Sequence, residues 1–464
     1  MDCYRTCDIR GKYPEEVNED LFFHFGRAIA LKFLAGREIL IGSDLRVSSP
    51  ALKQALAAGL VEGGATVFDA GQAPTPVHYF GKRKLGAYAV AIVTASHNPP
   101  EDNGLKLALG RFPASATQLR ALQPSPESLP SSQVRGRIEP VDLSSAYTDF
   151  LVDTWKDRLR SARLPGHLVL DPGNGAWALL IHEIIQRLDL PATVIHAQPD
   201  GSFPERSPDC AAPGNLVALS AEVQRMSASA GLAWDGDGDR LAVCDDAGRH
   251  LMTDHLVLLL LPSLLRNSHR EQILFDAKMS TKIRVTIESL GGIPVEERSA
   301  HCYLETRMIK DDCLFGCEYS GHFFYRALSG GDDGMYAALS VIDFLARGGK
   351  PLTAHRESLP PLHISPDLRI SGDGVDFEGV RDALRTAFKD ANIKEFDGVR
   401  VEVPGAWFLV RPSVSENKVS FRFEGDSRDN LNSMMNHVLE LLPQCRSPLA
   451  RQIARWRASD PASI

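Results

Sequence analysis

The sequence predicts an α/β protein with three successive α/β domains and a C-terminal α+β domain. Apolar segments of strand length alternate with longer helical patterns up to about residue 360, an order that is typical of α/β domains. Beyond Pro360 and Pro361 the pattern changes to paired short strands followed by a helix. With 464 residues, the chain has room for several domains of ordinary size.

The first domain is predicted to span residues 1–145. A stretch rich in Pro and Ser at 123–132 is predicted to be a surface loop shortly before its end. Short apolar runs and one longer helical pattern predict strands at 36–44, 65–68 and 85–93 and a helix at 50–63.

The second domain is predicted at 146–249 and begins with a helix at 147–159 and a strand at 167–170. That strand runs into a Gly-rich turn at 171–175, which could suggest phosphate binding. The turn lacks a Lys-Ser/Thr pair and the Gly-x-Gly-x-x-Gly pattern, so a tight turn between strand and helix is the better interpretation.

The last two domains are predicted at 250–360 and 361–464. In the third domain, apolar runs predict strands at 272–276 and 314–318. In the fourth, a helix is predicted at 430–442, and the arginines after Pro443 indicate a solvated terminal helix.

Composition narrows the class of protein. The chain has 51 basic and 59 acidic residues, a formal charge of -8, and no long block of either sign, which argues against nucleic acid as a partner. The N-terminus has no apolar core, and the longest aliphatic run, 256–261, stops at Pro262 and is too short to span a membrane. We therefore expect a cytoplasmic monomer that binds neither nucleic acid nor membrane.

Eight cysteines stand at positions 3, 7, 210, 244, 302, 313, 317 and 445. None forms a Cys-x-x-Cys pair, so the spacing predicts neither a zinc site nor a disulfide framework. This pattern indicates a protein of a reducing compartment.

Ser96 lies in the motif Thr-Ala-Ser-His-Asn-Pro-Pro, directly after the predicted strand 85–93. The prolines end that strand abruptly, so we expect Ser96 on a rigid loop at a strand's carboxyl end, where open α/β sheets bind ligands. It could be a hydrolase nucleophile, a phosphorylated serine that transfers its phosphoryl group, or a helix cap. The hydrolase interpretation is weakened because Gly-x-Ser-x-Gly is missing. The other two remain open.

Three aspartates alternate with glycine at Asp235, Asp237 and Asp239, between two apolar flanks. In an extended strand the first and last would lie about 13 Å apart, too far to share an ion, but the glycines permit the backbone to curl. Carboxylate oxygens in that number suit Mg²⁺ or Ca²⁺. An EF-hand calcium loop is disfavoured because Arg240 stands where that loop needs glycine.

Two further loops carry polar side chains. Glu318, Ser320 and His322 follow an apolar strand, and a carboxylate with a hydroxyl suits the vicinal hydroxyls of a sugar. Arg411 begins Arg-Pro-Ser-Val-Ser-Glu between two predicted strands, and one arginine with hydroxyls can bind a phosphate. Taken singly, the first is weak evidence and the second is equally well a polar hairpin tip.

In this order, the four loops resemble the α-D-phosphohexomutases, most closely the phosphomannomutase/phosphoglucomutase branch. The resemblance extends from Asp-Ile-Arg-Gly at 8–11 to the fourth loop. It implies four domains with mixed sheets around a central cleft, each domain contributing one loop. It also implies reversible transfer of a phosphoryl group between the 1- and 6-positions of a mannose or glucose phosphate, through a phosphoserine and a hexose 1,6-bisphosphate.

The resemblance implies a role for each matching residue. Ser96 would be the phosphoserine and would share one Mg²⁺ per chain with Asp235, Asp237 and Asp239; glucose or mannose 1,6-bisphosphate would act as activator and intermediate. The other implied residues are Arg10, Lys106, Arg240, His301 and His322 around the transferring phosphate, Glu318 and Ser320 at the sugar, Arg411, Ser413 and Ser415 at the distal phosphate, and Lys278 as a further substrate contact.

Proton transfer and substrate choice stay open at this stage. His322 and Lys106 are both candidates for the proton acceptor, and Lys106 would need neighbours that lower its pKa. Cys7 stands where the family usually has tyrosine. Cys317 stands where the family usually has glycine, just before Glu318 in the loop expected to bind the sugar. The alternatives are a phosphoglucosamine mutase and a catalytically silent sugar-phosphate-binding protein.

Overall fold

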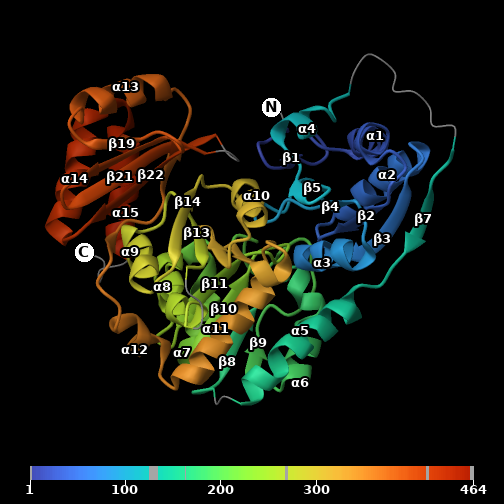
Figure 1. The fold of residues 1–464 in the computed structure, drawn as a ribbon, viewed down its shortest axis with the longest axis horizontal. Helices are drawn as coiled ribbons and strands as arrows, with labels where there is room; N and C mark the ends of the chain where they lie inside the picture. The colour runs from blue at the N-terminus through green and yellow to red at the C-terminus, as the bar shows by residue number, and fades with distance from the viewer. Residues whose placement is uncertain (1–2, 125–133, 162–163, 267–269, 414–416, 460–464) are drawn as a thin grey trace.

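The computed structural model describes residues 3–124, 134–161, 164–266, 270–413 and 417–459. Figure 1 shows a lobe of the N-terminal sheet and a lobe of the C-terminal sheet on either side of a notch, with the two middle sheets below them. Within the described residues there are four sheets in chain order, three mixed and the last antiparallel. This confirms the predicted fold class; most of the predicted surface loop lies outside the described residues.

The first sheet has the order β1-β5-β4-β2-β3-β7, with β6 pairing β5. The predicted strand 85–93 begins too early, because Leu85 is the last residue of a helix and Gly86, with φ +68°, caps it. The elements are β1 (Ile9–Lys12), α1 (Glu19–Ile29), a short π-helix (Ala30–Leu34), β2 (Ile39–Ser43), α2 (Ser49–Glu62), β3 (Thr66–Gln72), α3 (Thr75–Leu85), β4 (Ala89–Val93), β5 (Asp102–Leu109), β6 (Phe112–Pro113), α4 (Ala116–Arg120) and β7 (Arg137–Pro140).

The second sheet has the order β12-β11-β10-β8-β9. The Gly-rich turn after β8 is a packed turn, as the sequence predicts, because a Cβ on Gly175 would lie only 2.8 Å from the carbonyl oxygen of Gly236 in the aspartate loop. The elements are α5 (Ser144–Arg160), β8 (Leu168–Asp171), a 3-10 turn (Ala176–Leu179), α6 (Ile181–Leu188), β9 (Ala192–Val194), a 3-10 turn (Pro213–Leu216), α7 (Val217–Met226), β10 (Ala230–Trp234), β11 (Leu241–Asp245) and β12 (His250–Leu251).

The third sheet has the order β14-β13-β15-β16 and shares one apolar core with the second sheet and with part of the first. The three α/β units therefore form one packed body. The elements are α8 (Thr253–Leu264), β13 (Gln272–Asp276), α9 (Thr281–Ser289), β14 (Ile293–Glu297), α10 (His301–Asp311), β15 (Phe315–Cys317), β16 (Phe323–Tyr325), a 3-10 turn (Arg326–Leu328), α11 (Gly334–Gly348) and α12 (Leu352–Glu357).

The fourth sheet has the order β17-β22-β21-β20-β19, with β18 pairing β22, and it has an apolar core of its own. It contacts the third unit through buried polar side chains; Arg422, for example, donates a 2.6 Å hydrogen bond to Asp254. The elements are β17 (His363–Ile364), β18 (Leu368–Ser371), α13 (Phe377–Ala387), β19 (Asn392–Lys394), β20 (Val399–Val403), β21 (Ala406–Pro412), β22 (Lys418–Gly425), α14 (Arg428–Leu441) and α15 (Pro443–Ser459).

The cysteine prediction is wrong at one point, since Cys7 and Cys302 form a disulfide. Spacing rules detect cysteines that are close in sequence, whereas these two are 295 residues apart and meet only because the first and third units pack together. Among the described residues, no helix is long and apolar enough to cross a membrane.

Candidate active site

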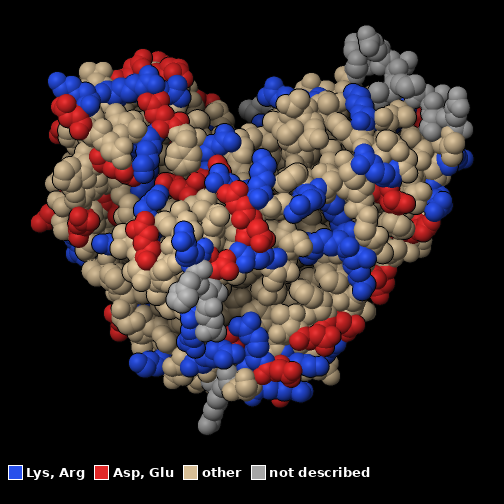
Figure 2. All heavy atoms as spheres, in the orientation of Figure 1, with Lys and Arg blue, Asp and Glu red and all other residues tan. Residues whose placement is uncertain are grey.

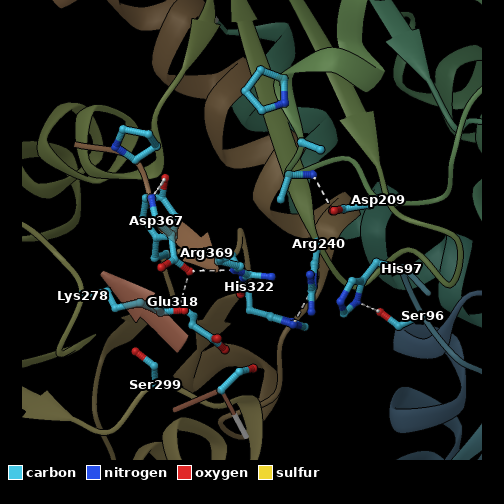
Figure 3. Close-up of a pocket in the computed structure, with 18 of the residues that line it drawn as sticks. Ser96, His97, Asp209, Arg240, Lys278, Ser299, Glu318, His322, Asp367 and Arg369 are labelled. Carbon is cyan, nitrogen blue, oxygen red and sulfur yellow. Dashed lines mark hydrogen bonds and ion pairs between the residues drawn. The ribbon is translucent and has the colours of Figure 1, made fainter. Parts of the chain in front are cut away.

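A cavity of about 1170 Å³ lies where the four units meet. Its lining includes the four sequence loops, with Ser96 from the first unit, Arg240 from the second, Glu318 from the third and Arg411 from the fourth. Figure 2 shows charged side chains of both signs around the hollow between the lobes, and Figure 3 shows the labelled side chains converging on the cavity. The central cleft implied by the sequence is therefore present.

Ser96 is held at the bottom of this cavity in a strained conformation. Its φ of +52° is in the left-handed region, its side chain is buried, and its backbone N–H donates to the Thr94 hydroxyl at 2.9 Å. The Ser96 Oγ donates to Asp235 Oδ2 at 2.7 Å. The helix-cap interpretation is wrong, because the chain goes from Ser96 through turns into the strand β5.

The sequence did not reveal what holds this loop. Arg46 is fully buried, and its guanidinium donates to the backbone carbonyls of Ser96 at 2.9 Å and Asn98 at 2.7 Å, and to two more at Pro99 and Asp102. Asp44 pairs with the same guanidinium at 3.2 Å. One sequence feature could have indicated this role. Asp44 is the last residue of the predicted strand 36–44 and Arg46 follows it closely, and in α/β sheets the loops after the strands are the ones that contact ligands.

The three aspartates converge as predicted. They lie between β10 and β11, where Gly238 has φ +82°, and one carboxylate oxygen from each lies within 4.8 Å of the others. Oδ1 of Asp237 and Oδ1 of Asp239 are buried and accept no hydrogen bond from the described residues. Burial and the two neighbouring carboxylates raise the pKa of Asp235 well above its usual value. These features fit a hard divalent cation held by oxygen ligands.

Lys106 reaches the same carboxylates from β5. Its Nζ lies 2.7 Å from Asp237 Oδ2 and also contacts Asp239. Burial alone would lower the pKa of Lys106, but the aspartates outweigh burial and raise it. The ammonium group of Lys106 is therefore charged in this arrangement, and a role for Lys106 in proton transfer stays a prediction.

His322 is oriented from both sides. Its Nδ1 lies 2.6 Å from Asp332 Oδ2, which fixes the proton on Nδ1, and Arg240 Nε donates to its Nε2 at 2.9 Å. His301 shares the same aspartate oxygen at 3.3 Å, and its ring centre is 5.2 Å from that of His322. Asp332 is a functional candidate that the sequence missed, because nothing in its local pattern indicates a histidine partner.

The loop that carries Glu318 and Ser320 has two polar atoms with unused hydrogen-bonding capacity. Glu318 Oε2 and Ser320 Oγ are buried and form no hydrogen bond to any described residue. Burial alone would raise the pKa of Glu318, but neighbouring basic side chains, with His322 and Lys278 foremost, lower it, so the carboxylate is charged. Cys317 points away from the cavity into the core, where its Sγ lies 3.6 Å from the carbonyl oxygen of Leu274.

Arginines stand at opposite ends of the cavity. Arg411 Nε lies 3.0 Å from Asp397, and its Nη2 donates to the Ser299 carbonyl at 3.0 Å. Ser413 also lines the cavity, while Ser415 lies outside the described residues. At the other end, Arg10 donates to Ala95 O at 2.9 Å, beside Ser96. Lys278 also lines the cavity, and its Nζ lies 3.3 Å from Asp367 Oδ2.

Comparison with known proteins agrees with this geometry. Models of the phosphoglucomutase/phosphomannomutase alpha/beta/alpha domains I, II and III match residues 2–123, 145–248 and 252–362. The chain belongs to the phosphoglucomutase/phosphomannomutase family. The resemblance seen in the four sequence loops is thereby confirmed.

Relatives of this phosphoglucomutase/phosphomannomutase family member match over nearly its whole length. It is 32% identical over 434 residues to the phosphomannomutase/phosphoglucomutase of Pseudomonas aeruginosa, covering 92% of both chains. It is 30% identical to the phosphoglucomutase of Neisseria gonorrhoeae, covering 97% of this chain and 99% of that one. A family protein from Burkholderia thailandensis superposes with a TM-score of 0.84 at 28% identity, covering 96% and 98%.

Proposed function

We propose that this enzyme is a phosphohexomutase that moves a phosphoryl group between the 1- and 6-positions of mannose or glucose phosphates, through a phosphorylated Ser96 and a hexose 1,6-bisphosphate. One observation carries the proposal. The Ser96 hydroxyl contacts the three-carboxylate loop inside a cavity whose other walls present Glu318, Ser320 and Arg411. The named relatives support the same activity.

The charge balance of the cavity supports a bisphosphate ligand. A phosphoserine and a second phosphate each carry about -2, and the three aspartates add negative charge that must be neutralised. A bound Mg²⁺, held by Asp235, Asp237, Asp239 and the seryl phosphate, would supply Lewis-acid stabilisation of the transferring group. The remaining neutralisation comes from Arg10, Lys106, Arg240, His301, Lys278 and Arg411.

His322 is the proposed proton acceptor. The Asp332 carboxylate holds the proton on Nδ1, so the Nε2 lone pair is the free basic position once Arg240 turns toward a phosphate. The hydroxyl of the sugar loses its proton to Nε2 as its oxygen attacks the phosphorus atom of the phosphoserine. The bond between phosphorus and Ser96 Oγ breaks, and Ser96 Oγ is the leaving oxygen, which takes a phosphoryl group back from the other end of the bisphosphate. Arg240 stays protonated and acts as a charge clamp, because the surrounding carboxylates raise its pKa despite its burial.

The sugar must bind in two opposed orientations. Glu318 Oε2 and Ser320 Oγ have hydrogen-bonding capacity to spare, so they suit two ring hydroxyls near the sugar's pseudo-symmetry axis. In either orientation Arg411 and Ser413, with Ser415 as a further expected contact, hold the phosphate that is not being transferred. Recognition of this kind would not separate glucose from mannose, which differ only at C2.

His301 gives a pH prediction. Burial alone would lower its pKa, but Asp332 and Glu305 outweigh burial and the repulsion of Lys106, and raise the pKa of His301 to about 9. The ring is therefore a cation at neutral pH and loses its charge as pH rises through that value. We expect the KM for the sugar phosphate to rise about tenfold across this range, the scale of a lost charge-assisted hydrogen bond.

Steady-state kinetics from pH 7 to pH 10 measure this rise in KM, and the variant His301→Gln is the control. The variant should have the high KM at every pH, because it has no charge to lose. An equal rise in KM with pH in the variant would mean that another group loses its proton in this range, such as the neighbouring Glu305.

The proposed activity is tested with four substrates. We would measure turnover of mannose, glucose, glucosamine and N-acetylglucosamine phosphates, each with a catalytic amount of glucose 1,6-bisphosphate. Preference for mannose or glucose phosphate is expected. Preference for glucosamine phosphate would identify a phosphoglucosamine mutase, and binding without turnover of any substrate would identify a silent binding protein.

A further inference from the structure

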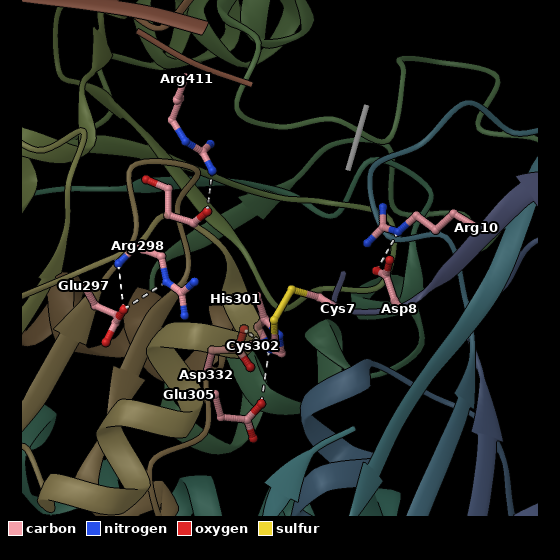
Figure 4. Close-up of a disulfide and its surroundings, with 11 residues drawn as sticks. Cys7, Asp8, Arg10, Glu297, Arg298, His301, Cys302, Glu305, Asp332 and Arg411 are labelled. Carbon is pink, nitrogen blue, oxygen red and sulfur yellow. Dashed lines mark hydrogen bonds and ion pairs between the residues drawn. A yellow bond between two sulfur atoms is a disulfide. The ribbon is translucent and has the colours of Figure 1, made fainter. Parts of the chain in front are cut away.

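We propose that Cys7 and Cys302 form a reversible redox-modification site, in which a disulfide between the first and third units tightens the binding of the sugar phosphate. The proposed activity supplies only one of the readouts, so the redox chemistry can be tested separately. Figure 4 shows the bridge between the segment that leads to Arg10 and the start of α10. The two Cα atoms are 5.5 Å apart, which is in the usual range for a disulfide.

The bridge joins two groups that the mechanism uses. On one side, Cys7 is followed by Asp8, which pairs with Arg10 at 2.7 Å, and Arg10 in turn donates to the Ser96 loop. On the other side, Cys302 is the second residue of α10 and directly follows His301. The disulfide therefore ties together the two chain segments that carry Arg10 and His301, both of which line the cavity.

Accessibility distinguishes Cys7 from the other cysteines, since its partner Cys302 is buried. Cys7 is only partly buried and lines the cavity, so a small thiol reagent that enters the cavity can reach it. The remaining six cysteines, at 3, 210, 244, 313, 317 and 445, are buried and not disulfide-bonded. Burial raises the pKa of the thiols of Cys210, Cys244 and Cys317, which makes them poor nucleophiles.

The position of Cys302 favours reversible formation of the disulfide. Its sulfur lies in the first turn of α10, and a helix N-terminus stabilises a thiolate. A stabilised thiolate attacks a disulfide readily and also leaves readily, so the bond can form and open by exchange.

The proposed oxidant is a small-molecule disulfide such as glutathione disulfide. The Cys7 thiolate attacks one glutathione sulfur, breaks that S–S bond and releases one glutathione thiolate. The Cys302 thiolate then attacks the Cys7 sulfur of the mixed disulfide and releases the second glutathione. The two protein thiols lose two electrons and two protons in total; glutathione disulfide takes them up and becomes two molecules of reduced glutathione.

The expected effect is on affinity. In the oxidised enzyme Arg10 and His301 are held in place before the substrate arrives. Less conformational entropy is therefore lost when the substrate binds to these two groups. In the reduced enzyme the N-terminal segment is tied to the third unit by non-covalent contacts alone. We expect a KM for the sugar phosphate about three- to tenfold lower in the oxidised form than in the reduced form.

The test equilibrates the full chain in glutathione mixtures from fully reduced to fully oxidised. Thiol alkylation followed by mass spectrometry reports the state of Cys7 and Cys302 without using activity. KM, kcat and the calorimetric affinity for glucose 1,6-bisphosphate are then measured in each mixture. Cys7→Ser and Cys302→Ser should match the reduced wild type and be insensitive to oxidant. Cys313→Ser removes a buried thiol that donates to Gln272 Oε1 at 3.8 Å, outside the cavity lining, and this variant should respond to oxidant like the wild type.

Three results would overturn the proposal. One is a wild-type chain in which Cys7 and Cys302 stay unlinked, or carry glutathione, in every mixture. A second is a bond that forms but leaves both KM and the calorimetric affinity unchanged. A third is an affinity that falls on oxidation. If the chain lacked mutase turnover altogether, alkylation and calorimetry would still decide the redox claim.

Discussion

Replacing Ser96 with alanine should abolish mutase turnover, with a loss of roughly 10⁵-fold or more, the scale seen when a covalent nucleophile is removed. The hydroxyl is the atom that would carry the phosphoryl group, and it faces Asp235 at 2.7 Å. The fold should survive, because alanine has the same Cβ and pays the same cost as serine for the left-handed backbone at φ +52°. Coupled assays of glucose 1-phosphate turnover measure the loss.

Mass spectrometry completes this test. The wild type, after exposure to glucose 1,6-bisphosphate, should carry one phosphate on Ser96, and Ser96→Ala should carry none. Ser340→Ala removes a hydroxyl on α11 outside the cavity lining and is the matched control, which should keep both phosphate and turnover. Turnover like that of the wild type in Ser96→Ala would refute the role of the serine.

Removing divalent metal should also stop turnover, by on the order of 10³-fold or more, because a principal stabiliser of the transferring charge is lost. Among the described residues, Oδ1 of Asp237 and Oδ1 of Asp239 accept no hydrogen bond, and the pairing of Lys106 with the Oδ2 atoms of both residues leaves these two oxygens for the metal. Chelation followed by addition of Mg²⁺, Mn²⁺ or Ca²⁺ measures the loss and shows which ion restores turnover. Activity that survives thorough chelation would contradict the metal site.

A binding readout separates the metal site from the chemistry. Mg²⁺ should raise the melting temperature of the wild type, since a ligand that binds only the folded state stabilises it. Asp239→Asn should abolish this rise. Asp245→Asn changes a buried carboxylate on β11 that instead pairs with Arg249, so it should lower stability but keep the response to Mg²⁺.

The sequence by itself determined the succession of α/β units and the loops that carry the chemistry. Strand-ending prolines placed Ser96 at a loop, and alternating glycines allowed the three aspartates to meet. Those features are local, because prolines and glycines act on the backbone of their immediate neighbours. The helix at 75–85 was not predicted, because a local pattern also assigns the apolar Leu85 to the strand that follows it. Only the structure shows that Leu85 ends a helix, which Gly86 caps.

Only the tertiary structure decided which groups face one another across the cavity. Asp332 orients two histidines, Arg46 holds the Ser96 loop, and Cys7 meets Cys302, yet no spacing rule connects these partners. The charge state of Lys106 was decided in the same way, because it depends on carboxylates more than a hundred residues away. Contacts between distant segments depend on how whole units pack, and that packing is a property of the folded chain as a whole.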